Sequence, residues 1–70
     1  MYYENMMPYE DILDILNRIL EWSEINPRFD ATTFEGIKRH YEDYGEFSFR
    51  QMDAIVNVYY KWKIDKWCER

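Results

Sequence analysis

The two side chains that most often act as bases or nucleophiles near neutral pH occur once each, at His40 and Cys68. Asp43 follows His40 by three residues, a spacing at which two helical side chains can meet and a carboxylate can orient a base. The same spacing is typical of a solvated surface pair, and we prefer that interpretation. Cys68 has no histidine nearby in the sequence, so we expect no thiolate nucleophile there.

Metal or cofactor chemistry would need donor groups that the sequence does not supply. One histidine and one cysteine are too few nitrogen and sulfur ligands for a zinc site. Glu10, Asp11 and Asp14 could bind a hard cation weakly, but no glycine-centred calcium loop accompanies them. Gly36 and Gly45 stand alone, so no phosphate-binding glycine loop can be drawn. The sequence therefore predicts a protein that uses no cofactor or metal and is not an enzyme.

A second set of side chains suits recognition. Several carboxylates recur at spacings that place them on neighbouring faces of one helix: Glu10, Asp11, Asp14, Glu21 and Glu24. Residues 1–35 hold eight acids and two bases, a net charge of -6, whereas residues 36–70 hold six acids and seven bases, a net charge of +1. This balance argues against general binding to phosphate backbones. The carboxylates fit a protein partner, although a solvated helix face would have the same pattern.

Aromatic residues make up 20% of the chain, more than the buried faces of its helices can hide. We expect some of them to be exposed: Tyr2, Tyr3, Phe49, Tyr60 and Trp67. Tyrosine and tryptophan supply large, stiff contact areas and are enriched at binding hot spots. Together with the acidic residues of the first helix, Tyr2, Tyr3, Tyr60 and Trp67 are the predicted partner-binding residues.

Basic residues concentrate near the C-terminus and alternate with aromatic ones. The set that suits single-stranded nucleic acid, by charge and by stacking, is Arg50, Tyr60, Lys61, Lys63, Lys66 and Trp67. The overall charge of -5 opposes such binding, and cations in the last turns of a helix also suit its dipole. Nucleic acid is therefore the alternative partner, and a homodimer that buries the leftover aromatic residues is a further one.

Three helices, at about residues 8–25, 31–44 and 49–66, must position these side chains. Pro8 suits the first helical position, and Asn26-Pro27 ends the first helix. The second helix begins at Asp30, or at a capping box of Thr32 and Glu35, and ends at Gly45.

The third helix has the sharpest start signal in the sequence. Ser48 and Gln51 have the spacing of a capping box, and Phe47 and Met52 stand at the two positions of a hydrophobic staple. Apolar residues then continue along one helical face. Only Gly45 to Ser48 separates this helix from the second one, so the two must turn tightly.

Three amphipathic helices with short connections predict an all-α fold, a compact three-helix bundle in a single domain of residues 1–70. The expected core includes Phe34, Tyr41, Tyr44, Met52 and Tyr59, with Trp22 and Trp62 closing the ends. Residues 1–7 have no periodicity and would form a short aromatic N-terminal arm, either frayed or lying on the bundle.

The remaining features limit where such a protein works. No apolar run approaches the roughly 18 residues that cross a bilayer, so we expect no membrane association. No secretory signal pattern is visible, and one cysteine cannot form an internal disulfide. A cytoplasmic setting is the expectation.

About a third of the chain carries a pattern seen elsewhere. The stretch from Tyr44 to Ile55, continuing to Tyr59-Tyr60-Lys61-Trp62, resembles a small helical segment of many bacteriophage proteins. The shared pattern is a glycine, one residue, an apolar residue, serine or threonine, two residues, then glutamine and an apolar helix that ends near Lys-Trp.

This resemblance implies a phage or mobile-element origin and brings no catalytic residue to this chain. Small acidic phage proteins of this kind include anti-CRISPR and anti-restriction inhibitors. These bind a host protein and block it, either sterically or by imitating the charge of DNA. A DNA mimic would depend on Glu10, Asp11, Asp14, Glu21 and Glu24. Because a charge of -5 is modest for a mimic, we prefer a mixed acidic and aromatic interface with a host protein in the host cytoplasm.

Overall fold

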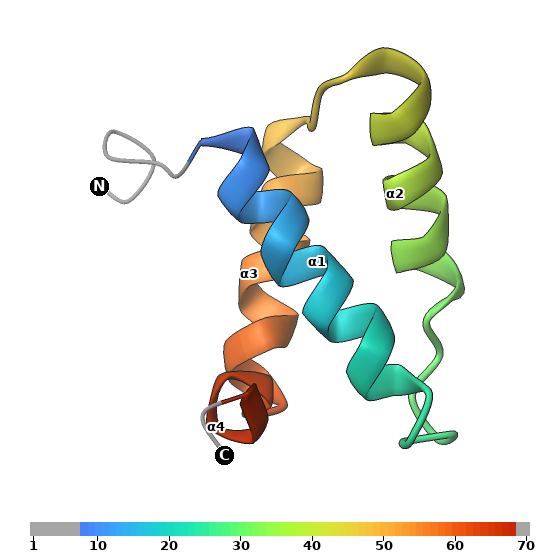
Figure 1. The fold of residues 1–70 in the computed structure, drawn as a ribbon, viewed down its shortest axis with the longest axis vertical. Coiled ribbons are helices and arrows are strands. Elements are labelled where there is room, and N and C mark those ends of the chain that lie inside the picture. The colour runs from blue at the N-terminus through green and yellow to red at the C-terminus, as the bar shows by residue number, and fades with distance from the viewer. Residues whose placement is uncertain (1–7, 69–70) are drawn as a thin grey trace.

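The computed structural model describes residues 8–68, and in that range it contains helices and turns but no strand (Figure 1). The helices are α1 (Tyr9–Ser23), α2 (Thr32–Tyr44), α3 (Phe49–Lys61) and α4 (Ile64–Cys68). The predicted all-α fold class is confirmed. The predicted N-terminal arm, which includes Tyr2 and Tyr3, lies outside the described residues.

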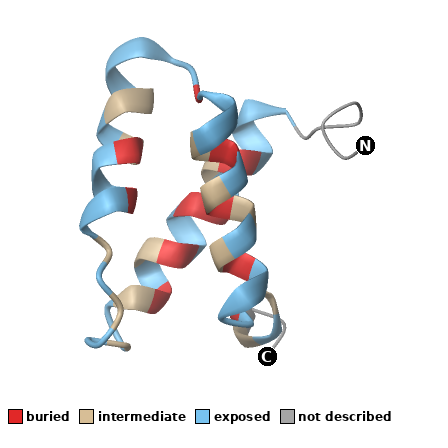
Figure 2. Ribbon diagram, turned by 180° about the vertical axis from the view of Figure 1, so that it is seen from behind, coloured by how far each residue is buried: buried red, intermediate tan, exposed pale blue. Residues whose placement is uncertain are grey.

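The helix α1 is the centre of the arrangement, because it packs against α2, α3 and α4. In Figure 1, α2 lies on one side of α1, and α3 with α4 lies on the other. Figure 2 shows the buried residues on the inward sides of the three longer helices. The Cα radius of gyration is 11.7 Å, close to the roughly 11 Å expected for a compact chain of this length.

The ends of α1 differ slightly from the prediction. Pro8 stands just before the helix instead of at its first position, and its carbonyl accepts the N–H groups of Asp11 and Ile12. The helix ends at Ser23, two residues early, because the amides that follow bond three residues back in tighter turns. The Asn26 side chain donates to the Trp22 carbonyl at 2.9 Å and covers this end.

The start of α2 uses only one of the two predicted signals. The N–H of Thr32 donates to Oδ1 of Asp30 at 3.0 Å, and the capping box of Thr32 and Glu35 is not formed. Hydrogen bonds from Thr32, first through its backbone and then through its side chain, hold the pKa of Asp30 below its usual value. The helix ends as predicted at Gly45, whose φ of 72° suits glycine.

The start of α3 matches the prediction closely. Gln51 N–H donates to Ser48 Oγ at 3.1 Å, and Ser48 N–H donates to Gln51 Oε1 at 2.9 Å, which completes the capping box. Phe47 and Met52, the two staple residues, are both buried in the core.

The predicted end of the third helix at residue 66 is wrong, because the helix stops at Lys61 and Lys63 has a φ of 57°. In an unbroken helix Ile64 would follow the exposed Tyr60 by one turn and would also face outward. The left-handed Lys63 redirects the chain, and Ile64 becomes fully buried at the start of α4. Burial of this isoleucine is the physical reason for the break.

The core contains most, but not all, of the residues expected there. Its buried members are Ile12, Ile15, Leu16, Ile19, Trp22, Phe34, Ile37, Phe47, Met52, Ile55, Tyr59 and Ile64. Tyr41 is half-buried against them. Tyr44 is 69% exposed, so its assignment to the core is wrong: it belongs to the last turn of α2, where its ring lies against His40. Trp22 closes one end of the core as predicted, but Trp62 does so only in part, since it is 47% exposed.

Candidate functional site

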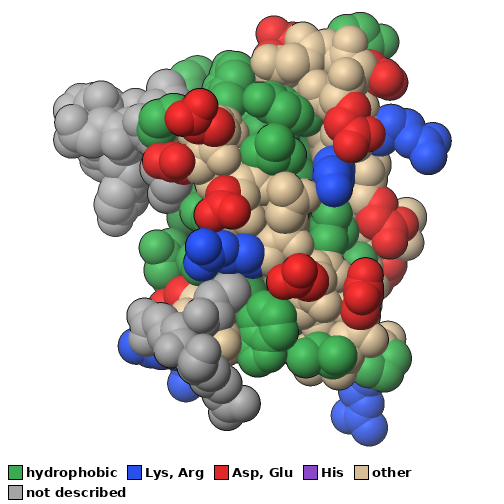
Figure 3. All heavy atoms as spheres, viewed as in Figure 1, with side chains coloured by type: hydrophobic (Ala, Val, Ile, Leu, Met, Phe, Trp, Pro, Cys, Tyr) green, Lys and Arg blue, Asp and Glu red, His purple; other side chains and the backbone are tan. Residues whose placement is uncertain are grey.

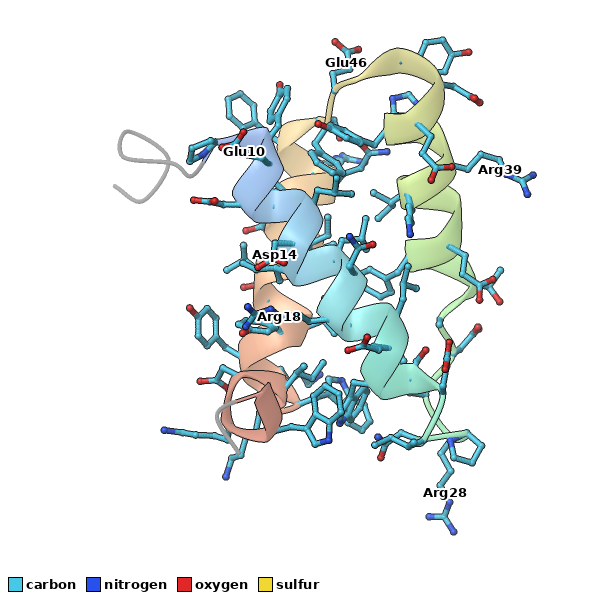
Figure 4. The ribbon with its side chains drawn as sticks, in the orientation of Figure 1. Glu10, Asp14, Arg18, Arg28, Arg39 and Glu46 are labelled. Atoms are coloured by element: carbon cyan, nitrogen blue, oxygen red, sulfur yellow. The ribbon has the colours of Figure 1, made fainter. Side chains whose placement is uncertain are left out.

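The acidic row, as we call it, consists of four carboxylates: Glu10, Asp14 and Glu21 on the outward side of α1, and Glu24 at its C-cap. They follow one another at steps of four, seven and three residues, which keeps them on one side of a helix. All four are exposed, while the buried residues of α1 lie on the opposite side of the helix. Figure 4 shows Glu10 and Asp14 along the near side of α1, and Figure 3 shows acidic side chains spread over that face.

One member of the acidic row has a basic neighbour within α1. Arg18 Nη2 lies 3.2 Å from Asp14 Oδ2, in an exposed pair one helical turn apart. Such a surface pair contributes at most about 1 kcal/mol to stability. Within residues 8–68, no ion pair joins Glu10, Glu21 or Glu24 to a base, so their charges are presented to solvent.

The fifth predicted acidic residue, Asp11, is also exposed but stands apart from the acidic row. It is rotated by about 100° from Glu10 around the helix axis. In the first turn of α1 its charge stabilises the helix dipole.

The predicted aromatic contact residues differ in how far they are exposed to solvent. Tyr60 is 55% exposed on α3, with its ring edge against Tyr59 at a centroid distance of 5.2 Å. Trp67 is half-buried and packs against the core from α4, so the expectation that it is exposed is wrong in part. Its burial follows from the break in front of α4, which turns this short helix toward the core. Tyr2 and Tyr3 lie outside the described residues.

The predicted nucleic-acid residues divide into two places. Arg50 is exposed in the first turn of α3, about 16 Å along the helix axis from Lys61. Lys61, Lys63 and Lys66 are exposed around the junction of α3 and α4, and we call them the basic corner. The structure therefore keeps three of the four predicted bases near one another and separates Arg50 from them.

A group of aromatic rings at the turn after α1 was not predicted as a surface. The Trp62 ring lies 5.7 Å from that of Trp22 and 5.5 Å from that of Phe29, and Phe29 also stacks on Phe34 at 5.8 Å. Trp62 is 47% exposed, Phe29 is half-buried, and Ile25 is 63% exposed in the same turn. We call Ile25, Phe29 and Trp62 the end patch. The Asn26-Pro27 turn, which begins four residues after Trp22, is the sequence signal that could have indicated it.

Among the described residues, the structure shows no cluster that suits metal chemistry. The half-buried ring of His40 lies against Tyr44, with 4.7 Å between ring centroids. Across the described range, no three histidine, cysteine, aspartate or glutamate side chains gather so that they could hold a metal ion.

Comparison of the chain with models of protein families, with curated proteins and with solved structures finds no match. None of the helices described here has both the length and the apolar character needed to cross a membrane.

Proposed function

We propose that this chain is a non-enzymatic protein-binding module, in which a three-helix bundle presents the acidic row of α1 to a basic surface of its partner. In line with the resemblance of residues 44–62 to a bacteriophage segment, the partner is a host protein that the module inhibits or modulates in the host cytoplasm. Recognition combines carboxylates with exposed aromatic side chains, and Tyr60 is more exposed than Trp67, the other predicted aromatic contact residue in the described range.

The observation that carries this proposal is the acidic row itself. Four exposed carboxylates follow one side of α1 and its C-cap, and the opposite side of the helix packs against the core. Because Glu10, Glu21 and Glu24 form no ion pair within the described residues, they contribute a negative potential along α1. Such a potential steers a positively charged partner toward this helix and orients it on arrival.

Affinity capture from a bacterial lysate tests the proposal, with the lysate divided into nuclease-treated and untreated halves. The bait is the full chain as wild type and as the double variant Glu10→Lys/Asp14→Lys. The matched control reverses two exposed acids of α2, Glu42→Lys/Asp43→Lys, and changes the net charge by the same amount. Circular dichroism establishes that each variant is folded.

We expect a protein that is retained after nuclease treatment, is lost with Glu10→Lys/Asp14→Lys and is kept by the α2 control. An equal loss of capture in both double variants would show that net charge alone governs binding, and full capture by both would remove α1 from the interface.

A second candidate, binding of single-stranded nucleic acid, is favoured by the basic corner. Lys61, Lys63 and Lys66 are exposed beside the half-exposed Trp62, which combines cations with a stacking surface. In this case the captured material disappears on nuclease treatment, and affinity for a labelled oligonucleotide falls steeply as salt rises.

A further inference from the structure

The end patch lies at one extreme of the molecule. The turn that carries Ile25 and Phe29 and the junction of α3 and α4 that carries Trp62 are found at the same end of the bundle (Figure 1). The rings of Phe29 and Trp62 are in contact, with 5.5 Å between their centroids. Ile25 is 63% exposed and Trp62 is 47% exposed. An aliphatic side chain and an indole therefore face solvent where the molecule ends.

The turn within this patch is held by its own hydrogen bonds. The carbonyl of Trp22 accepts the N–H of Ile25 at 3.1 Å and the side-chain amide of Asn26 at 2.9 Å. The carbonyl of Asn26 in turn accepts the N–H of Phe29 at 2.9 Å. Ile25 is thus presented on a preorganised backbone, which lowers the entropy cost of binding.

Cations stand on both sides of the end patch. Arg28 is exposed in the same turn and points away from the bundle at this end (Figure 4). The three exposed lysines of the basic corner lie around the junction of α3 and α4. Figure 3 shows hydrophobic side chains at this end of the molecule, with Lys and Arg side chains to either side of them. The apolar surface is therefore flanked by positive charge.

Acidic residues at this end are fewer than the bases. Residues 24–31 and 61–67 together hold four bases and three acids, a net charge of +1, whereas the whole chain has a net charge of -5. The three acids are Glu24, Asp30 and Asp65. Glu24 belongs to the acidic row, and Asp30 Oδ1 accepts a backbone N–H at the start of α2. Among the described residues, no ion pair holds any of the four bases.

Anionic lipid headgroups above an apolar layer match this combination. An indole is favoured at the boundary between headgroups and acyl chains, because it is apolar with one polar edge. Lys and Arg side chains near an anionic bilayer each strengthen binding about fivefold. A nucleic acid would use Trp62 and the basic corner, but Ile25 has no ring on which a base could stack. The aliphatic side chain gains only in an apolar medium, and it favours the lipid.

We propose that the end patch is a peripheral membrane anchor. Ile25 and Trp62 enter the boundary between headgroups and acyl chains of an anionic bilayer, while Arg28 and the basic corner bind the headgroup phosphates. The expectation of no membrane association came from the lack of a crossing segment, and a peripheral contact needs none. Glu10 and Asp14, at the other end of α1, remain accessible to a protein partner.

Sedimentation of the full chain with lipid vesicles tests the proposal. Wild type is expected to bind vesicles of phosphatidylcholine mixed with phosphatidylglycerol, and not vesicles of phosphatidylcholine alone. Ile25→Glu changes an exposed residue, so it preserves the fold, and it is expected to weaken binding at least about tenfold. Tyr44→Glu, on a residue that is 69% exposed at the far end of α2, is the matched control and is expected to bind like the wild type. Circular dichroism establishes that each variant is folded.

Charge reversal tests whether this end of the molecule faces the lipid. Arg28→Glu is expected to weaken vesicle binding at least about fivefold. Arg39→Glu makes the same change on an exposed base along the outer side of α2 and is expected to bind like the wild type (Figure 4). Equal losses in these two variants would show that net charge alone governs binding, and this outcome would overturn the proposal.

Tryptophan fluorescence tests insertion itself. Trp62 is the most exposed of the three tryptophans, since Trp22 is buried and Trp67 is half-buried. The emission of the wild type is expected to shift to shorter wavelength on the anionic vesicles, and Trp62→Phe is expected to bind them with most of this shift lost. A wild type that ignores anionic vesicles, that binds them with no shift, or that binds only a labelled single-stranded oligonucleotide would overturn the proposal.

Discussion

Two ring clusters lie at opposite ends of the helices, one around Phe47 and one around Trp62. At the first, Phe47 stacks on Tyr41 with 4.4 Å between centroids and meets the edge of Tyr9 at 5.6 Å. At the second, Trp62 meets Trp22 at 5.7 Å and Phe29 at 5.5 Å, separations close to that between Phe47 and Tyr9. Yet Phe47 is 3% exposed and Trp62 is 47% exposed.

The difference comes from what the backbone does next to each ring. Phe47 lies in the short connection before α3, held by the capping box on one side and by the Tyr9 hydroxyl, which donates to its carbonyl at 3.3 Å. Trp62 lies where α3 stops, and the left-handed Lys63 redirects the chain so that Ile64 is fully buried while the indole stays half-exposed. Similar ring contacts therefore stabilise the fold at one end and leave a surface at the other.

Removing the buried ring is expected to have the largest effect. Phe47→Ala should lower the free energy of unfolding by about 3–5 kcal/mol, because it removes a core side chain and leaves a cavity. The single core of a domain this small rarely supplies more than about 3–5 kcal/mol, so much of the protein would then be unfolded at room temperature. Urea denaturation followed by circular dichroism measures the change. Tyr44→Ala, a change on an exposed ring, is the control and should cost far less.

Removing the half-exposed ring should cost less. We expect Trp62→Ala to lower the free energy of unfolding by about 1–2 kcal/mol, since roughly half of the indole already faces water. Trp62→Phe should retain most of the ring contact with Trp22 and Phe29. If Trp62→Ala proved as destabilising as Phe47→Ala in the same assay, the contrast between the two clusters would be lost.

The capping box next to Phe47 gives a smaller effect. Ser48→Ala leaves the N–H of Gln51 without its acceptor and should lower the free energy of unfolding by about 1 kcal/mol. Ser48→Asp keeps an acceptor at the same position and should restore most of the loss in thermal unfolding. Equal melting temperatures for wild type and Ser48→Ala would contradict a stabilising role for this cap.

At the other cluster, one substitution should increase stability. Lys63→Gly relieves a positive φ in a residue with a side chain and should raise the free energy of unfolding by up to about 1 kcal/mol. Lys61→Gly, two residues earlier in the last turn of α3, is the control and should be destabilising. A loss of stability in both variants would indicate that the side chain of Lys63, and not its backbone conformation, matters at the break.

The sequence predicted best those features that depend on local hydrogen bonding. Ser48 and Gln51 marked the start of α3, and Gly45 marked the end of α2, because each satisfies backbone groups within a few residues. The acidic row was also predicted, since it needs only the period of a helix. Its role as a binding surface stays a prediction.

The features that the sequence could not reveal depend on contacts between distant residues. Trp62-Lys63-Ile64 contains no glycine or proline, so no local signal predicted that α3 ends there. The break results from burial of Ile64 against the rest of the core. The end patch combines Ile25 and Phe29 from a turn with Trp62 from another helix, and no single helical period connects them. Tyr44 fitted the apolar stripe of α2. It is nevertheless 69% exposed, because it belongs to the last turn of the helix, where it does not reach the core.

The most direct test of a protein-binding role for α1 is the dissociation constant of the captured host protein, measured by isothermal titration. Wild type, Glu10→Lys/Asp14→Lys and Glu42→Lys/Asp43→Lys are compared at one salt concentration. The proposed interface predicts that the α1 variant loses about a hundredfold in affinity, equivalent to about 2.7 kcal/mol, while the α2 control stays close to the wild type. Equal affinities for all three proteins, or equal losses in both variants, would contradict it.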